Sequence, residues 1–196
     1  PEITSSHNGS STHEILRLTG TSHLSQIGET GPAIASLPLE EHGSNAEYRR
    51  YEVIFGRDAM RVADTLLHRF PKLAHTTLVT LAKHQGVSWN TAREEEPGRI
   101  VHELRDPKTD PIARELTEKR GWDWPYYGSV DATPQFVRTL AAYCRETSNG
   151  IDILQETFRG RDGVSHSMAE ALQAAVGWIQ MRLDQSHDSL LEFKSA

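Results

Sequence analysis

The sequence predicts an all-α fold built from helical hairpins with long ordered loops. Apolar residues recur at helical spacing from Met60 to Phe70 and again from Leu73 to Ala82. A longer amphipathic stripe runs from Met168 to Leu183. The sequence shows no convincing series of alternating apolar and polar residues of the kind that indicates strands. Two successive pairs of helices therefore suggest an array of helical hairpins.

The first predicted hairpin begins at Gly56-Arg57-Asp58, after a short extended run at residues 51–55. Asp58 suits an N-cap or the first helical turn, because a carboxylate is stabilised near the positive end of the helix dipole. Pro71 ends the first helix and can open the second, since proline is tolerated at the first helical position. Gln85-Gly86 closes the second helix. This pattern predicts a hairpin with almost no loop.

Residues 86–130 break the helical pattern and are dense in charge between Arg93 and Arg120. A long loop inside a compact domain is usually functional or disordered. Aromatic residues cluster at the end of this one, which favours a function. A short helix is expected within it, over Ile112–Lys119.

The third helix is predicted from about Thr133 to Glu146, with Pro134 in its first turn and Asn149-Gly150 as the turn that follows. Ser165 or Ser167 is expected to cap the fourth helix. The apolar stripe of that helix is expected to face the core. Its members are Met168, Leu172, Ala175, Val176, Ile179 and Leu183.

Composition limits the classes of function. The chain has 196 residues and a formal net charge of −6, which argues against non-specific binding of nucleic acid. No apolar run approaches the roughly 20 residues of a membrane span. The single cysteine, Cys144, excludes an internal disulfide. The ten histidines contain no HxH or HxxxH pair, so no metal site and no cofactor are expected. We expect a cytoplasmic protein.

Two parts are predicted along the chain. Residues 1–46 are rich in Ser, Thr, Gly and His and are predicted to be a linker or an N-terminal extension. Residues 47–196 are predicted to hold the hairpins.

The segment Tyr126–Pro134 places one carboxylate, Asp131, directly before a helix and beside two tyrosines, with Trp124 nearby. Aromatic surroundings would raise the pKa of a carboxyl group by removing it from water, as a general acid requires. Aromatic rings also suit the apolar faces of sugars. Alternatively, Asp131 caps the helix that follows it, and the aromatic residues belong to the core.

Several segments together resemble the six-hairpin (α/α)6-barrel glycosidases, most closely the bacterial amylo-α-1,6-glucosidase or glycogen-debranching type. They are Phe55-Gly56-Arg57-Asp58, Gln85-Gly86, Glu95–Arg105, Tyr126–Pro134, and Trp178-Ile179 with Asp184 and Leu190–Phe193. The resemblance covers residues 50–196. It implies an incomplete (α/α)6 toroid that acts on an α-glucan or oligosaccharide.

The resemblance implies a role for each matching residue. Arg57 and Asp58 would hold the sugar at the cleaved end, because a guanidinium and a carboxylate can bridge adjacent hydroxyls. Asp131 would be the general acid of an inverting hydrolysis. The alternative for Arg57 and Asp58 is an ordinary helix start.

Two further groups of residues would border the active site. Glu96, His102 and Glu103 would either bind substrate or fix the loop through ion pairs with Arg93, Arg99 and Arg105; we favour the structural role. Trp124, Tyr126 and Tyr127 would stack on sugar faces or serve as core residues, and both interpretations stay open.

The resemblance also implies what the chain does not supply. In these enzymes the second carboxylate lies on later hairpins, so no residue here can be assigned as the base. We therefore expect the remainder of a catalytic domain, or self-association, to complete the fold, and we expect the chain alone to be inactive. The alternative is a carbohydrate-binding or helical interaction module without catalysis. A generic helical scaffold would bind no sugar.

Overall fold

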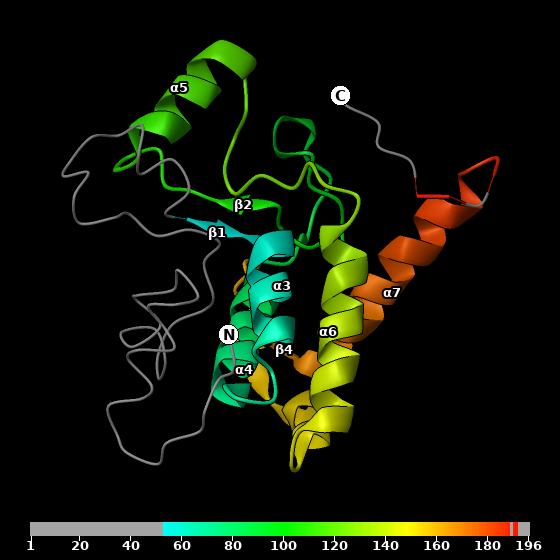
Figure 1. The fold of residues 1–196 in the computed structure, drawn as a ribbon. Coiled ribbons are helices and arrows are strands. Elements are labelled where there is room, and N and C mark those ends of the chain that lie inside the picture. Colours follow the sequence, from blue (N-terminus) through cyan, green and yellow to red (C-terminus); the bar gives the residue numbers. More distant parts are fainter. Residues whose placement is uncertain (1–52, 189, 192–196) are drawn as a thin grey trace, which may run out of the picture.

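Four helices build the body of the molecule in the computed structural model, which describes residues 53–188, 190 and 191. They are α3 (Gly56–Thr65), α4 (Pro71–Lys83), α6 (Ala132–Glu146) and α7 (Met168–Asp184). Helices α3, α4 and α6 lie side by side, and α7 packs along α6 before diverging from it (Figure 1). The all-α class is confirmed. The predicted linker at residues 1–46 lies outside the described residues.

Smaller elements connect the four helices. Helix α5 (Pro111–Arg120) stands apart from the body, above the first strand pair (Figure 1). The remaining elements are two 3-10 helices, η2 (Thr91–Arg93) and η3 (Gly150–Gln155), and two antiparallel strand pairs, β1 (Ile54–Phe55) with β2 (Glu103–Leu104) and β3 (Thr157–Arg159) with β4 (Ser165–Ser167). None of the helices in these described ranges is both long and apolar enough to cross a membrane.

The first hairpin forms where the sequence predicts it, with one difference. Asp58 lies in the first turn of α3, and Pro71 opens α4. Helix α3 ends at Thr65, however, so residues 66–70 form a turn that separates the two helices. Leu66 is the C-cap of α3, and its backbone N–H donates to the Val62 carbonyl at 3.1 Å. The expectation of almost no loop was therefore wrong.

Local caps delimit α5 and α7, and the predicted cap at Ser167 is confirmed. Helix α5 begins after Asp110, whose side chain accepts from two backbone amides of the first turn, and it ends at Gly121 in the left-handed conformation, with φ at 68°. Ser167 caps α7 in a capping box with Glu170. The side chains of Asp110 and Ser167 accept hydrogen bonds from backbone amides that have no partner within the helix.

The apolar stripe predicted for α7 is only partly buried. Val176 is 47% exposed, and the buried residues are Met168 and Ala175 of the predicted stripe together with Ala171 and Trp178. The reason is that the loop after α4 packs on the alanine side of α7. The Gln85 amide donates to the carbonyls of Gly98 and Ala171, at 2.8 and 3.0 Å. A Cβ on Gly98 would lie 2.2 Å from the Ala174 carbonyl oxygen.

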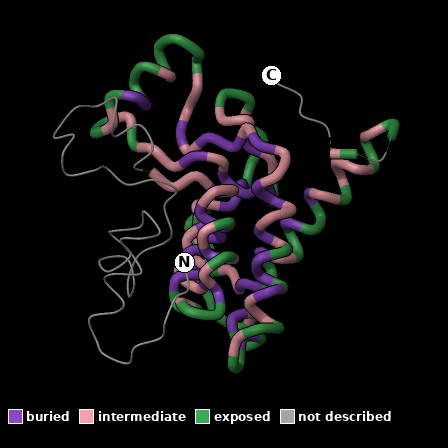
Figure 2. Tube along the Cα trace, in the orientation of Figure 1, coloured by how far each residue is buried: buried purple, intermediate pink, exposed green. Residues whose placement is uncertain are grey.

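The main core lies where the four helices meet (Figure 2). Fully buried members include Met60 of α3, Leu78 of α4, Phe136 of α6 and Met168 of α7. Burial of such side chains contributes roughly 1.5–3 kcal/mol each. This core holds the helices in a fixed order, so the positions of their ends are fixed too.

A short backbone ladder organises the N-terminal ends of α3 and α6. Phe55 pairs with Glu103, which in turn bridges to Tyr126. The Gly56 amide donates to the His102 carbonyl at 2.8 Å, and the His102 amide donates to the Tyr126 carbonyl at 2.9 Å. Three segments far apart in the sequence thus meet at one place, and the last of them, Tyr126, lies six residues before the first residue of α6.

We predict opposite effects for two glycine substitutions in helices. At Gly56 a Cβ would lie 2.0 Å from the Val101 carbonyl oxygen, so Gly56→Ala should lower the free energy of unfolding by about 2 kcal/mol or more. Gly177 in α7 has no neighbour within 4 Å, so Gly177→Ala should raise it by about 1 kcal/mol. Urea unfolding of both variants tests this. If Gly56→Ala stabilised the protein as much as Gly177→Ala does, the close approach of Gly56 to the Val101 carbonyl would be contradicted.

Candidate functional site

Arg57 and Asp131 meet although 74 residues separate them. Arg57 lies in the first turn of α3, and Asp131 directly precedes α6. Arg57 Nη1 donates to Asp131 Oδ2 at 3.1 Å, and Arg57 Nη2 lies 3.6 Å from Asp58 Oδ2. The side chains of Arg57 and Asp131 are 43% and 48% exposed. One guanidinium and two carboxylates therefore face solvent together at the N-terminal ends of two helices.

Ser129 completes the cluster, and the sequence analysis gave it no role. Its Oγ donates to Asp131 Oδ1 at 2.5 Å and accepts from the Ala132 backbone amide at 3.3 Å. Ser129 thus makes the contact to the first turn of α6 that the alternative interpretation gave to Asp131, and Asp131 makes no side-chain cap hydrogen bond. A serine shortly before a predicted helix start was the signal that could have found it.

The electrostatics of Asp131 contradict the expected upward shift. Partial burial acts to raise its pKa, but the hydrogen bonds from Ser129 and Arg57 and the charge of Arg57 outweigh that effect. The pKa of Asp131 is therefore held below its ordinary value, and the carboxylate is ionised at neutral pH. The hydrogen-bond partners of Asp131 are Ser129 and Arg57 rather than the neighbouring aromatic residues.

His102 lies beside this cluster. Its ring packs edge-on against Phe55 and Tyr126, with centroid distances of 5.9 and 6.2 Å. Burial and the nearby charge of Arg57 lower the pKa of His102, so the imidazole is neutral at pH 7. Within the described part of the chain, His102 Nδ1 and Arg57 Nε are buried without a hydrogen-bond partner. Buried polar atoms of this kind are uncommon in native structures.

The aromatic residues proposed for sugar stacking are buried. Trp124 packs against α5, where its indole N–H donates to the Thr117 hydroxyl at 3.0 Å. Tyr126 stacks on Trp122 with a centroid distance of 3.8 Å. Tyr127 is fully buried, and its hydroxyl donates to the His84 carbonyl at 2.6 Å. These positions favour the core interpretation of all three.

Glu96 and Glu103 take part in ion pairs, as expected for a structural role. Glu96 lies 3.7 Å from Arg99 and accepts from the Trp178 indole at 2.6 Å, so it ties the loop to α7. Buried Glu103 accepts from Arg105. Of the nine candidate residues, the structure brings Arg57, Asp58, His102 and Asp131 together. The two glutamates instead fix the loop that carries His102.

A buried charge network holds the start of the loop. The Glu95 side chain is fully buried and accepts from Arg161 at 2.8 Å and from the Val87 amide at 2.9 Å. Burial acts to raise the pKa of Glu95, but these hydrogen bonds and the charge of Arg161 lower it below the usual value. Arg161 also donates to the Tyr127 hydroxyl at 2.6 Å. The turn between β3 and β4 is thereby linked to the segment that leads to Asp131.

The site offers charged hydrogen-bond donors and acceptors. Among the described residues no group of three or more His, Cys, Asp or Glu side chains is arranged to hold a metal ion. No protein-family model matches this sequence, and comparison with curated proteins gives no match. The resemblance to debranching-type glycosidases therefore stays a prediction. The guanidinium of Arg57 nonetheless supplies several hydrogen-bond donors beside the acceptors of Asp58 and Asp131.

Removing the Arg57 charge should raise the pKa of Asp131. A carboxyl group whose folded pKa is depressed contributes stability above its unfolded pKa, and this contribution is lost as the pH falls through the folded pKa. We predict that Arg57→Gln shifts the titration of Asp131 upward and reduces this loss of stability at acid pH. Carbon-detected NMR of the side-chain carboxyl measures the shift.

Arg138 provides a matched control for that experiment. It pairs with Asp64 and, like Arg57, links α6 to α3 across 74 residues. Arg138→Gln should leave the Asp131 titration unchanged. A similar shift in both variants would mean that the pKa responds to net charge rather than to the contact with Arg57.

Loss of Arg161 should destabilise the fold. Arg161→Met leaves the buried Glu95 carboxylate with Arg93 at 3.7 Å as its remaining cation, so we expect a loss of about 3 kcal/mol at pH 7. Because Glu95 is protonated in acid, the difference should shrink below about pH 4. Exposed Arg159 supplies the control, and Arg159→Met should change stability by less than about 0.5 kcal/mol. Urea unfolding at pH 7 and below about pH 4 measures the free energy of unfolding of each variant. An equal loss in Arg161→Met and Arg159→Met at pH 7 would contradict the prediction.

Proposed function

We propose that this chain is the first part of the catalytic domain of a glycoside hydrolase that acts on α-glucans, with Arg57, Asp58 and Asp131 at the substrate. The observation that supports the proposal is the approach of Arg57 and Asp131 to 3.1 Å with both side chains accessible to solvent. Adjacent hydroxyls of a sugar could bridge such a pair.

The fold part of the proposal is an incomplete (α/α)6 toroid. In it, α3 with α4 and α6 with α7 would be two neighbouring hairpins. Their pairwise packing is compatible with this arrangement. The base that activates water would come from outside residues 1–196, and the reaction would be inverting.

Asp131 would be the general acid, and this role needs a change at the site. A general acid must be protonated, whereas Arg57 and Ser129 keep the pKa of Asp131 low. In the proposal, the sugar draws Arg57 onto its hydroxyls and excludes water from Asp131. Both effects would raise the pKa of Asp131.

A second candidate is a carbohydrate-binding module without catalysis. The ionised state of Asp131 favours it, because a carboxylate held by Arg57 is a good acceptor for sugar hydroxyls and a poor proton donor. In this case the sugar would bind while Arg57 stays on Asp131, and the pKa of Asp131 would not rise. A helical interaction module would bind no sugar at this place.

Calorimetric titration with maltoheptaose and a branched dextrin tests the site. We expect binding without hydrolysis by the 196-residue chain. Arg57→Gln and Asp131→Asn should each weaken binding about tenfold or more, since a hydrogen bond to a charged group contributes about 1.5–3 kcal/mol. Arg138→Gln should bind like the wild type. Absence of binding would contradict both candidates, and hydrolysis that Asp131→Asn abolishes would show that the base lies within this chain.

The two candidates are separated by the titration of Asp131 in the presence of saturating maltoheptaose. The hydrolase proposal expects the pKa of Asp131 to rise on binding. A pKa that stays below its ordinary value in the complex would favour the binding module.

A further inference from the structure

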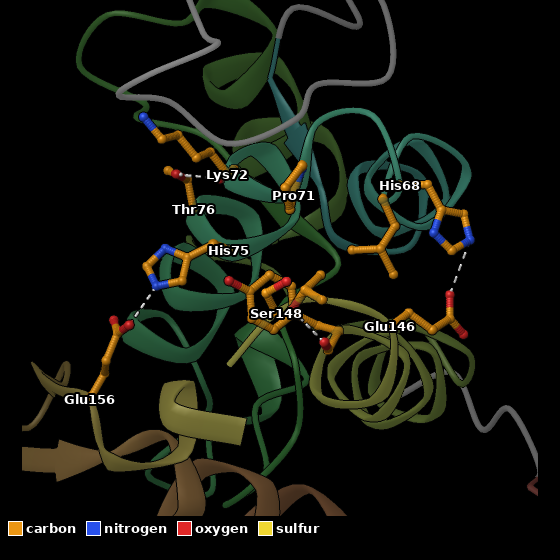
Figure 3. Close-up of a pocket in the computed structure, with 11 residues that line it drawn as sticks. His68, Pro71, Lys72, His75, Thr76, Glu146, Ser148 and Glu156 are labelled. Atoms are coloured by element: carbon orange, nitrogen blue, oxygen red, sulfur yellow. Dashed lines mark hydrogen bonds and ion pairs between the residues drawn. The ribbon is translucent and has the colours of Figure 1, made fainter. Parts of the chain in front are cut away.

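Figure 3 shows an open cavity of about 670 Å³ near the C-terminal end of α6, whereas Asp131 precedes the N-terminal end of that helix. The turn after α3, the start of α4, the end of α6 and the residue after η3 line it. Helix α6 has 15 residues, so its two ends lie about 20 Å apart. The cavity is therefore separate from the Arg57 and Asp131 cluster, and its volume falls within the range of about 300–1,000 Å³ for small-molecule sites.

Two pairs of histidine and glutamate frame the cavity. His75 Nε2 lies 2.6 Å from Glu156 Oε1, and His68 Nε2 lies 3.4 Å from Glu146 Oε2. Figure 3 shows the pairs on opposite sides, with Ser148 between them. Each pair joins two elements that are distant in sequence, so polar groups from four segments converge on one space.

The charges in the cavity favour an uncharged ligand. The carboxylates of Glu146 and Glu156 disfavour phosphate and other anions. Each of these carboxylates already has a histidine partner and Lys72 also lines the cavity, so a strongly cationic ligand would have to compete with these contacts. What remains is a dense set of donors and acceptors, which suits a molecule that carries many hydroxyl groups.

Apolar surface is present beside these polar groups. Pro71 and Leu67 line one part of the cavity, and Tyr143 lies behind it with its ring 6.0 Å from the His75 ring. A sugar presents C–H groups on its ring faces and hydroxyls around its edge. The rings of Tyr143 and Pro71 can pack against the C–H groups, and the pairs of histidine and glutamate can bind the hydroxyls.

We propose that this cavity is a second binding site for an uncharged, hydroxyl-rich ligand of the malto-oligosaccharide class. The preference for a neutral polyol follows from the cavity itself, whereas the choice of an α-glucan rests on the proposed function. The site would hold a second stretch of glucan away from Asp131. Two linked contacts on one polymer raise its apparent affinity when the chain spans both sites.

Hydrogen exchange with added maltoheptaose or cellohexaose, read by mass spectrometry, tests the proposal region by region. We expect maltoheptaose to slow exchange in peptides that cover residues 66–76 and 143–156. Ser148 is exposed, so Ser148→Trp should fill the cavity without disturbing the core and abolish this protection. Gln173→Trp is the matched control, since it places the same ring at an exposed position of α7 away from the cavity.

A milder variant guards against misfolding. Glu156→Gln keeps the shape of the side chain and removes one charged acceptor, so half-saturation should require about tenfold more maltoheptaose. Thermal melts of all variants report whether each one is folded. Undiminished protection in folded Ser148→Trp and Glu156→Gln would overturn the proposal.

The outcomes separate the two sites. Protection near residues 53–58 and 126–133 alone would overturn the cavity proposal and leave the proposed function standing. Protection at the cavity that persists in Arg57→Gln supports an independent second site. Protection at the cavity by cellohexaose alone would support a polyol site and overturn its assignment to α-glucans. No protection by either sugar would overturn the cavity proposal.

Discussion

The backbone ladder that joins residues 54–56, 102–104 and 126 is the constraint on which the candidate site depends. Its hydrogen bonds fix the start of α3 against the end of a long loop. Gly56 lets α3 approach Val101 closely, because a Cβ there would overlap the Val101 carbonyl oxygen. Arg57 and Asp131 can reach each other only because this approach brings the N-terminal ends of α3 and α6 together.

The long loop keeps its shape through buried charges more than through helix or sheet. Glu95 lies inside the fold with Arg161, and buried Arg99 donates to the carbonyls of Glu94 and Ser129, at 2.7 and 3.1 Å. The second of these contacts fixes the backbone two residues before Asp131. Breaking a buried pair leaves an uncompensated charge, so such a network strongly disfavours other loop conformations. The result is a rigid support for an exposed pair of charges.

The two ends of the helix group offer different polar surfaces. At the N-terminal ends of α3 and α6, one arginine serves two carboxylates, and the dipoles of both helices stabilise the negative charge. At the opposite end, two glutamates pair with histidines around a cavity that Lys72 also lines. We propose a polyol at each place and assign bond cleavage to the first alone.

Local patterns in the sequence were enough to predict the all-α class, the starts of α4, α6 and α7, and the presence of α5, because caps, prolines and apolar spacing act within a few residues. The same patterns pointed to Arg57, Asp58, His102 and Asp131 as candidates. Tertiary contacts were needed to show that Arg57 and Ser129 hold Asp131 ionised, that Trp124 and Tyr127 are buried, and that Val176 of α7 is exposed. These outcomes depend on contacts between segments far apart in the chain, and local patterns contain no information about which long-range partner a side chain meets.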